Sequence, residues 1–331
     1  MNAIRIAATG GPEVLQLRDL PIPEPKAGEV LVRIEAAGVN FIDVYERTGL
    51  YPPARLPFVP GREGAGLVER VGEGVTDFTA GARVAFAMVE GAYAEFASIP
   101  AARLVPVPPG VTLTDAAALM LQGMTAHYLS HDTFALAAGM TALVHAGAGG
   151  VGSLLTQFAK AKGATVIATV GSDEKAERSR RAGADHVIVY TREDFGERTR
   201  ALCGGAKVDV VYDSVGASTW QRSLEVLRPR GYFVLFGASS GPVPPFDLQI
   251  LNAKGSLFAT RPSLGHYVLT RAELLARAQA VFAARADGTL ALLPVRTYPL
   301  ADAAHAHQDL EARRTVGKLL LLPGGSPADQ I

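Results

Sequence analysis

The sequence of 331 residues contains one cysteine, Cys203. A single thiol cannot form an internal disulfide, and it cannot build the cluster of cysteines that holds a structural zinc ion. Among the seven histidines, two close pairs, His127 with His131 and His305 with His307, are isolated from other ligand residues along the chain. The composition therefore gives no support for a metal site made of cysteine and histidine.

Excess charge and long apolar runs are absent as well. Lysine and arginine together number 32, as do aspartate and glutamate, so the formal net charge is zero. A neutral chain lacks the charge that draws proteins to nucleic acid or to an acidic membrane surface. No run approaches the roughly 18 apolar residues of a membrane span, and the first residues, MNAIRIAATGG, lack the apolar core of a signal peptide. We therefore expect no membrane or nucleic-acid partner and a cytoplasmic location.

The length exceeds what one ordinary hydrophobic core needs, so we expect two domains. Up to about residue 122 the sequence has short runs rich in β-branched and aromatic residues, separated by glycine and proline turns. These runs predict strands at 30–37, 66–71, 81–86 and 93–99. Many short strands with such turns are typical of a barrel-like β domain.

From residue 141 on, strand and helix patterns alternate. Short apolar runs predict buried strands at 141–146, 165–170, 186–190, 208–212, 231–236 and 255–260. Helical periodicity predicts helices at 150–162, 173–182, 194–202 and 218–228. Six strands with helical connections indicate an α/β fold with a Rossmann-type, doubly wound parallel sheet. A helix at 270–286 and strands at 295–300 and 318–322 are expected to rejoin the first domain.

A glycine-rich turn joins the first of these strands to the first helix, and its spacing is Ala146-x-x-Gly149-x-x-Gly152. Alone this is a weak signal, because a tight turn that binds nothing has the same composition. Within the alternating pattern it favours a dinucleotide-binding turn, in which the backbone approaches a pyrophosphate and the helix N-terminus faces the phosphates. The expected cofactor contacts here are Ala146, Gly149, Gly150, Val151 and Gly152.

The end of the second strand bears on the choice of cofactor. An NAD enzyme usually has a carboxylate there, about twenty residues beyond the glycines, for the ribose 2′-hydroxyl. This tip reads Thr169-Val170-Gly171-Ser172, and Lys175 follows. A lysine and a serine suit a 2′-phosphate, so NADPH is favoured over NADH. Asp173 and Glu174 are nearby and weaken the argument, unless they only complement the helix dipole.

Several longer motifs resemble one branch of the medium-chain dehydrogenase/reductase superfamily, the zinc-free quinone oxidoreductases, which include bacterial NADPH:quinone reductases and the zeta-crystallins. The matching stretches are GVNFID (38–43), GLYPP (49–53), PGREGAGLVERVGEGV (60–75), HAGAGGVG (145–152), VYDSVG (211–216) and KGSLFATRPSL (254–264). The resemblance implies a GroES-like β-barrel catalytic domain over 1–123, a Rossmann NADPH-binding domain over 124–262, and a return to the catalytic domain over 263–331.

The resemblance also bears on zinc. Zinc alcohol dehydrogenases of this superfamily place a cysteine where this chain has Asn40, and a His-Glu pair where it has Arg62-Glu63. Asparagine is a poor zinc ligand and arginine is none, so we expect no zinc. Without a Lewis acid, an acceptor that takes hydride readily is favoured. A quinone fits, because its reduction restores aromaticity, and an activated enone is the next candidate.

Further site residues are implied by the same resemblance. On the cofactor side they are Thr125, Gly216, Phe236, Ser240, Phe258 and Arg261, with Lys175 and Tyr190 against the adenosine phosphate. On the substrate side, Asn40 and Asp43 would contact the nicotinamide ribose or carboxamide, and Tyr45 and Tyr51 would line the quinone pocket. The alternatives are a helix cap for Asn40, packed aromatics for the tyrosines and an ordinary exposed Arg261. No general acid is assured, although Tyr51 can donate a proton.

The sequence therefore predicts a zinc-independent NADPH:quinone oxidoreductase with hydride transfer in the cleft between the domains. A homodimer joined through the last sheet strand, 255–260, is implied by the resemblance. Two alternatives remain open: an NADPH-dependent alkenal or enone reductase, and a cofactor-binding structural or RNA-binding protein like some zeta-crystallin relatives.

Overall fold

A computed structural model describes residues 1–324. The described residues form two compact units, one made of residues 1–124, 268–286 and 294–324, the other of 125–267 and 287–293. Within residues 1–324, no helix has the length and apolarity needed to cross a membrane.

The second unit is built on a six-stranded parallel sheet within residues 141–260. Its strands are β8 (Thr141–His145), β9 (Thr165–Val170), β10 (His186–Val189), β11 (Val208–Asp213), β12 (Leu227–Leu235) and β13 (Phe258–Thr260), in the order β10-β9-β8-β11-β12-β13. The predicted doubly wound sheet is confirmed. The strand order reverses at β8, and ligands of such sheets bind outside the carboxyl ends of the strands at this point.

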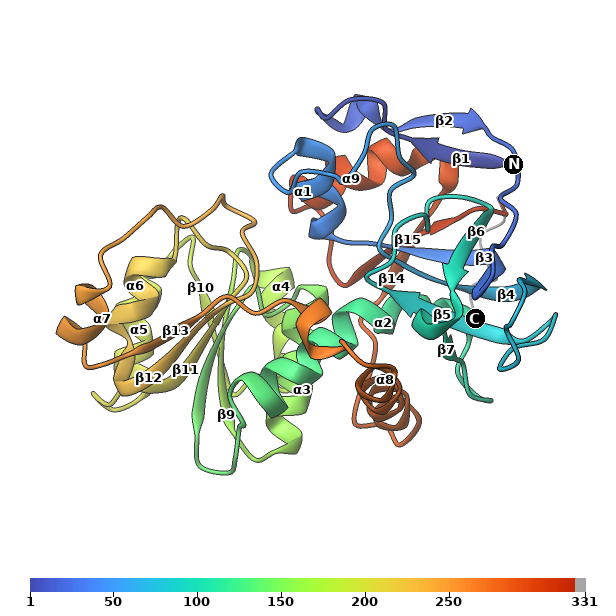
Figure 1. Ribbon diagram of the computed structural model, residues 1–331. Coiled ribbons are helices and arrows are strands. Elements are labelled where there is room, and N and C mark those ends of the chain that lie inside the picture. Colours follow the sequence, from blue (N-terminus) through green and yellow to red (C-terminus); the bar gives the residue numbers. More distant parts are fainter. Residues whose placement is uncertain (325–331) are drawn as a thin grey trace. The chain divides into compact units, whose positions relative to one another are not determined.

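Helices cover both faces of this sheet. Figure 1 shows α3 (Gly150–Ala161) and α4 (Asp173–Arg181) on one face, and α5 (Phe195–Leu202) and α6 (Trp220–Glu225) on the other. The side chains of Trp220 and Leu224 pack with Leu143, Val211 and Phe233 of the strands in one apolar core. The periodicity that predicted these helices reflects this burial.

Three boundaries in this unit differ from the sequence prediction by three residues or more. The helix expected at 218–228 ends at Glu225, and β12 begins at Leu227 rather than at 231. The strand expected at 255–260 is limited to 258–260, because α7 (Gln249–Ala253) and the turn after that helix come before it. In that turn Gly255 and Ser256 have φ angles of 114° and 55°, which no strand adopts.

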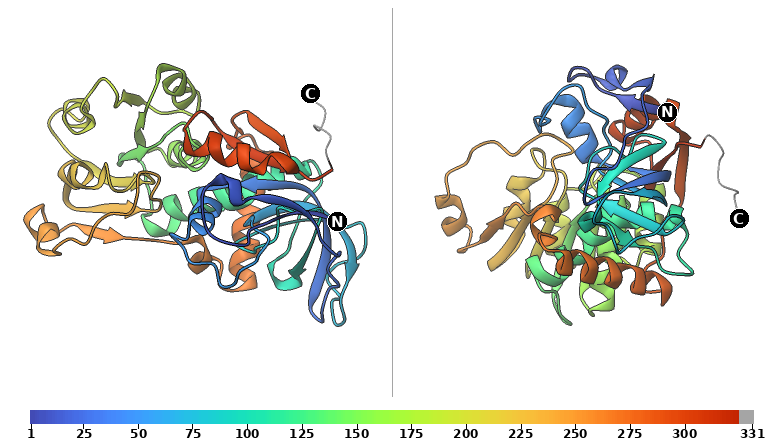
Figure 2. Two further views of the ribbon diagram at one scale, coloured as in Figure 1. Left: turned by 90° about the horizontal axis from the view of Figure 1, so that it is seen from above. Right: turned by 45° about the vertical axis from the view of Figure 1, so that its right-hand side comes forward.

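The first unit contains a seven-stranded sheet among its described residues, in the order β14-β15-β3-β4-β5-β7, with β6 paired to β3. Its strands are β3 (Glu29–Val39), β4 (Glu63–Val71), β5 (Arg83–Ala87), β6 (Phe96–Pro100), β7 (Val105–Pro106), β14 (Val295–Pro299) and β15 (Lys318–Leu322). β15 is antiparallel to β3, and Figure 2 shows these C-terminal strands, in red, beside the N-terminal strands, in blue. The chain therefore returns to its first sheet.

Four α-helices and a two-stranded ribbon also belong to the described part of the first unit. The ribbon is β1 (Asn2–Arg5) with β2 (Gln16–Asp19), and the α-helices are α1 (Phe41–Thr48), α2 (Leu113–Tyr128), α8 (Arg271–Ala286) and α9 (Ala303–Glu311), of which α2 continues beyond residue 124 into the second unit. The ribbon and α9 were not predicted, and β6 begins at Phe96 rather than at 93. Apolar residues of both ends of the chain, among them Val32, Phe86 and Leu321, form one core.

Candidate functional site

The glycine turn of the second unit is shaped by close contacts. Ala146, directly after β8, has a φ angle of 53°, a conformation that a residue with a side chain rarely adopts. Its carbonyl oxygen accepts a hydrogen bond of 2.8 Å from the N–H of Gly149. A Cβ atom at Gly152 would lie 2.3 Å from that same oxygen. Only glycine fits at 152, and the N-terminus of α3 is therefore held close to the end of β8.

The start of α3 suits a phosphate group. Its cap residue, Gly149, has no side chain to bond the first helical N–H groups, and Gly150, Val151 and Gly152 form the first turn. Helix N-termini present such unpaired N–H groups and a positive dipole end to anions. The structure thus brings together all five residues predicted for this turn.

The tip of β9 gathers a second predicted group. Ser172 caps α4, and its Oγ accepts a hydrogen bond of 3.4 Å from the N–H of Lys175. Tyr190 follows the neighbouring strand β10, and a Cβ at Gly171 would lie 2.8 Å from its hydroxyl. Gly171, Ser172, Lys175 and Tyr190 therefore lie at one edge of the sheet.

Arginines neutralise both acidic residues that follow this tip. The guanidinium of Arg192 donates to the two carboxylate oxygens of Asp173 at 2.9 and 2.5 Å, and this hydrogen bonding lowers the pKa of Asp173. Glu174 accepts a hydrogen bond of 2.7 Å from Arg178, one helical turn along α4. Sequence reasoning missed Arg192, although its position two residues beyond Tyr190, after the strand next to β9, was a usable signal.

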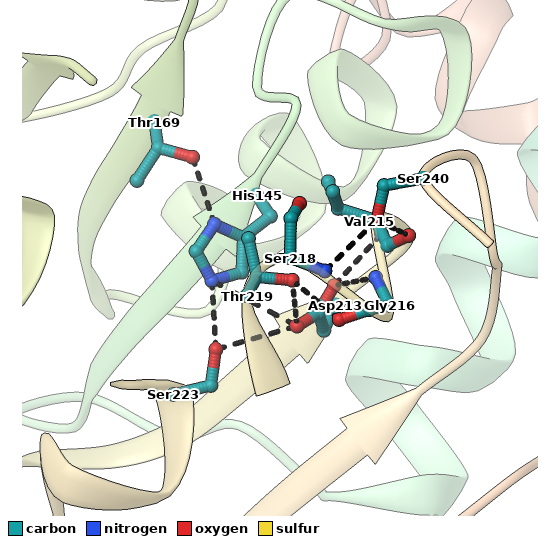
Figure 3. A network of polar contacts seen from close by, with 9 residues as sticks. All are labelled: His145, Thr169, Asp213, Val215, Gly216, Ser218, Thr219, Ser223 and Ser240. Atoms are coloured by element: carbon teal, nitrogen blue, oxygen red, sulfur yellow. Dashed lines mark hydrogen bonds and ion pairs between the residues drawn. The ribbon is translucent and has the colours of Figure 1, made fainter. Parts of the chain in front are cut away.

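A buried carboxylate organises the turn after β11 (Figure 3). Asp213 is completely buried, and its Oδ1 accepts hydrogen bonds from the N–H groups of Val215 and Gly216 at 2.7 and 3.0 Å. Its Oδ2 accepts from the hydroxyls of Thr219 and Ser223 at 2.7 and 3.3 Å. Four donors to one side chain fix the backbone of residues 213–216, which includes the predicted cofactor residue Gly216.

The same network reaches the glycine turn through His145, the last residue of β8 (Figure 3). Its ring nitrogens lie 2.8 Å from the Thr169 hydroxyl and 3.0 Å from the Ser223 hydroxyl, and Nε2 is 4.0 Å from Asp213. Burial lowers the pKa of His145, so the ring is neutral near pH 7. His145 and Asp213 thus tie together the ends of β8, β9 and β11, a link that the sequence did not reveal.

Of the remaining predicted cofactor residues, Phe236 and Ser240 lie against the Asp213 turn. The N–H of Phe236 donates to the Asp213 carbonyl at 2.8 Å, and the Ser240 hydroxyl donates to the Val215 carbonyl at 2.8 Å. A Cβ at Gly216, whose φ is 91°, would lie 2.6 Å from the Gly241 carbonyl oxygen. This part of the predicted set is brought together by the fold.

Three predicted cofactor residues stand apart from that turn. Phe258 lies on the edge strand β13 and stacks on Tyr232, with 4.6 Å between the ring centroids. Arg261, just beyond β13, donates to the Leu235 carbonyl at 3.2 Å. Thr125 is buried on α2. The roles of these three residues toward a cofactor stay predictions.

In the first unit, the predicted residues Asn40 and Asp43 meet at the start of α1. The N–H of Asn40 donates to the Asp43 carboxylate at 2.8 Å, which closes the first helical turn. The same carboxylate accepts from the Arg62 N–H at 3.1 Å and from the Tyr93 hydroxyl at 3.2 Å. Burial raises the pKa of Asp43 to about 7. Asp43 therefore holds the α1 entry in place from inside the unit.

A buried chain of side chains continues from Asp43. Nε2 of His307 lies 3.1 Å from the Tyr93 hydroxyl, and its Nδ1 lies 3.2 Å from the guanidinium of Arg47. Since arginine only donates, Nδ1 accepts and Nε2 carries the proton. Arg47 also pairs with Glu311 through two bonds of 2.8 Å. The chain links α1 to α9 through residues that sequence reasoning did not select.

The two predicted pocket tyrosines are neighbours. Their ring centroids are 5.1 Å apart in an edge-on arrangement, and the N–H of Tyr51 donates to the Tyr45 carbonyl at 3.0 Å. Tyr45 is buried, whereas Tyr51 is 38% exposed. Tyr51 is thus the more accessible of the two phenol groups.

Comparison with known proteins gives concordant results. The family model of the alcohol dehydrogenase GroES-like domain matches residues 26–109, and that of the zinc-binding dehydrogenases matches 150–273. A quinone oxidoreductase of Pseudomonas aeruginosa is 48% identical over 97% of this chain and 99% of its own length. The crystal structure of Escherichia coli quinone oxidoreductase complexed with NADPH has a TM-score of 0.96 and 45% identity, covering 98% of this chain and 100% of the other. A 2-haloacrylate reductase of a Burkholderia species is 43% identical over 95% of this chain and 96% of its own length.

The chain belongs to the quinone oxidoreductase family. The resemblance to that branch of the medium-chain dehydrogenase/reductase superfamily is thereby confirmed, as is the combination of a GroES-like domain with a Rossmann-type sheet.

Part of the superfamily binds zinc, and the corresponding positions of this quinone oxidoreductase chain are Asn40, Arg62 and Glu63. Their contacts show whether they could hold Zn²⁺. The ammonium of Lys318 lies 2.8 Å from Oδ1 of Asn40 and 2.5 Å from Oε2 of Glu63, and all three side chains are buried. The Arg62 side chain turns to Glu46, with an N···O distance of 2.8 Å. A cation with no ligand atom already lies between the two oxygens, so these residues do not fit Zn²⁺.

Two wider observations agree with that misfit. Within residues 1–324, no group of three or more histidine, cysteine, aspartate or glutamate residues is placed to hold a metal ion. A Cβ at Gly38 would lie 2.1 Å from the Glu63 carboxylate and 2.8 Å from the Lys318 ammonium. The glycine in the GVNFID motif therefore makes room for the Lys318–Glu63 ion pair.

Proposed function

We propose that this protein is a zinc-independent NADPH:quinone oxidoreductase whose second unit binds NADPH and whose first unit binds a small quinone. The observation that carries the proposal is the tip of β9, where Tyr190 lies beside Gly171, the N–H of Lys175 bonds the Ser172 hydroxyl, and the nearby Asp173 is neutralised by Arg192. This arrangement suits a 2′-phosphate. The NADPH complex of the relative from Escherichia coli supports the same choice of cofactor.

The cofactor's other phosphates fit the start of α3. The close approach of Gly152 to the Ala146 carbonyl leaves the first N–H groups of the helix accessible to a pyrophosphate. When bound, NADPH supplies a hydride from its nicotinamide ring. The Asp213 carboxylate holds residues 213–216 rigid through its four hydrogen bonds, so that this turn presents a fixed backbone surface to the ring.

The first unit contributes to hydride transfer mainly by orienting the quinone, and less by acid–base chemistry. Asp43 fixes the start of α1, and with it Asn40 and the helix that carries Tyr45. Water can protonate the oxygens of a hydroquinone, and Tyr51, partly exposed, is the candidate protein donor. If Tyr51 donates the proton, Tyr51→Phe lowers kcat while the matched change Tyr45→Phe leaves it within a few fold.

A second candidate function is reduction of an activated carbon–carbon double bond. The 2-haloacrylate reductase that is 43% identical to this chain favours it. Such an acceptor has a double bond polarised by a carbonyl group, and it would use the same cofactor site and differ only in the pocket. Alkenal and enone substrates belong to the same chemical class.

We also propose that two copies associate through β13. This strand is the edge of the six-stranded sheet, and its apolar side chain Phe258 is 51% exposed. An unpaired apolar edge favours pairing with a second copy. A cytoplasmic location stays a prediction.

The test uses absorbance to measure NADPH oxidation by chelator-treated protein. Benzoquinones and naphthoquinones are compared with an alkenal and with 2-chloroacrylate, and a primary alcohol plus NADP⁺ is tested for NADPH formation. Rapid turnover of quinones alone is the expected result. Turnover of the double-bond substrates with inert quinones would support the second candidate. Loss of activity on chelation that zinc restores would refute the zinc-independent mechanism.

A further inference from the structure

The segments that follow β9 and β10 lie side by side. These strands are parallel neighbours, and Val189 is paired with Val170. Beyond them the N–H of Tyr190 donates to the Val170 carbonyl at 3.0 Å, and the Thr191 hydroxyl donates to the Gly171 carbonyl at 3.3 Å. The direction of the second segment brings Arg192 to the first turn of α4.

Arg192 is joined there to Asp173 by an ion pair that water can reach. Each terminal nitrogen of the guanidinium donates one hydrogen bond to the carboxylate, and the side chains of Arg192 and Asp173 are 59% and 75% exposed. Exposed ion pairs contribute little to stability, so this pair can open at small cost. A guanidinium binds phosphate with the same two-pronged geometry that it uses for carboxylate.

An unpaired Asp173 would oppose the proposed cofactor. It directly follows Ser172 and lies two residues before Lys175, the two residues expected at the 2′-phosphate. A phosphate dianion beside a free carboxylate is repelled. Arg192 offsets that repulsion while it stays beside Asp173, and the guanidinium N–H groups that do not bond Asp173 offer the phosphate a charged partner.

Building on the proposed function, we infer that Arg192 determines the specificity for NADPH: its guanidinium turns toward the 2′-phosphate and binds it together with Lys175 and Ser172, and it stays beside Asp173, whose charge it continues to offset. Asp173 holds the guanidinium beside the site in the absence of the cofactor. The ion pair thus keeps Arg192 at the sheet edge, where its charge is available to both the Asp173 carboxylate and the 2′-phosphate.

The test measures binding rather than turnover. Dissociation constants for NADPH and NADH, and for the fragments 2′,5′-ADP and 5′-AMP, are determined by calorimetry. Arg192→Met keeps the apolar stem and removes the charge, so it should weaken NADPH and 2′,5′-ADP roughly 10- to 100-fold, the range for a lost charge-assisted hydrogen bond. NADH and 5′-AMP, which lack the 2′-phosphate, should change less than about twofold. Arg181→Met is the matched control, because Arg181 pairs with Glu177 on α4 and is 73% exposed.

A second pair of variants separates direct contact from neutralisation. Asp173→Asn removes the competing carboxylate and should strengthen NADPH binding a few fold. In the double variant Arg192→Met/Asp173→Asn, NADPH binding should stay weak, because the phosphate still lacks its partner. Full rescue in the double variant would show that Arg192 only neutralises Asp173, and it would overturn the inference.

Three further outcomes would also count against it. An unchanged NADPH affinity in Arg192→Met, or an equal loss for NADPH and NADH, would overturn the inference and leave the proposed function intact. Failure of the unaltered protein to bind NADPH and 2′,5′-ADP would overturn both. The failure of each proposal is therefore recognised separately.

Discussion

The buried chain from Asp43 to His307 predicts opposite pH responses in two variants. Both residues contact the hydroxyl of Tyr93. Burial raises the pKa of Asp43 from 3.8 to about 7. Burial, with the charge of Arg47, lowers the pKa of His307 from 6.5 to about 3. The folded chain therefore favours the neutral form of both groups.

The sign of each effect follows from the protons bound. Between pH 3.8 and about 7, folded Asp43 holds a proton that the unfolded chain lacks, so its contribution to stability grows as the pH falls. Between about 3 and 6.5, unfolded His307 holds a proton that the folded chain lacks, so its contribution is lost as the pH falls. Each slope is about 1.4 kcal/mol per pH unit. The two slopes cancel between pH 3.8 and 6.5.

Single substitutions expose one slope at a time. In His307→Asn the free energy of unfolding should rise as the pH falls through this window, by about 3–4 kcal/mol in all. In Asp43→Asn it should fall by a similar amount. The unaltered chain should show neither trend from these two groups. The prediction concerns the opposite slopes of the free energy of unfolding against pH in the two variants, and not the absolute stability of either one.

The assay is urea unfolding at several pH values, read by hydrogen exchange of the β3 peptides so that the first unit alone is followed. His305→Asn is the control, because His305 lies on the same helix but its side chain is 57% exposed. It should leave the pH profile flat. Asp43→Asn leaves His307 as the titrating group, so a stability that does not change with pH in this variant would refute the lowered pKa of His307. In the same way, a stability that does not change with pH in His307→Asn would refute the raised pKa of Asp43.

Three other variants test separate features. Gly152→Ala places a Cβ 2.3 Å from the Ala146 carbonyl oxygen; calorimetry should show at least about tenfold weaker NADPH binding, and unfolding a loss of about 1–3 kcal/mol. Lys318→Met leaves the carboxylate of Glu63 buried without its cation, and the free energy of unfolding in urea should fall by about 3–5 kcal/mol. The double variant Lys318→Met/Glu63→Gln should regain part of this loss, because the buried charge is removed as well. Ala259→Lys puts a charge on the edge strand β13, and sedimentation should then find monomers in place of the proposed dimers.

The fold of the second unit could be predicted because its signals are local. Each strand of the sheet is a short apolar run, each helix has its own periodicity, and the glycine turn identifies the first connection. The boundaries that failed depend on tertiary structure. Helix α6 ends at Glu225 because β12 starts early against β11, and a positive-φ turn at Gly255 shortens β13.

The missed parts of the site share one physical property: they join residues that are far apart in sequence. Lys318 bonds Asn40 from 278 positions away, and His307 bonds Tyr93 from 214 positions away. No periodicity or spacing encodes such pairs. Arg192 and Asp173 are 19 residues apart, and their meeting follows only once β9 and β10 are known to be neighbours. The sequence thus indicated residue types suited to the chemistry, whereas their partners required the fold.

The Lys318 ion pair also bears on which acceptors suit this chain. In zinc relatives of the superfamily a metal ligand stands at the position of Asn40, and a metal there can polarise a carbonyl. Here a positive charge is kept beside Asn40, but Lys318 is only 2% exposed and is already bonded to two oxygens. Such an ammonium fixes the protein around it and does not reach a substrate. The acceptor must then have a strong intrinsic affinity for hydride, which a quinone has through aromatisation and a haloacrylate through its conjugated double bond. A simple ketone has neither, so we expect the residues around Tyr51, and not the buried charge of Lys318, to decide between a quinone and a haloacrylate.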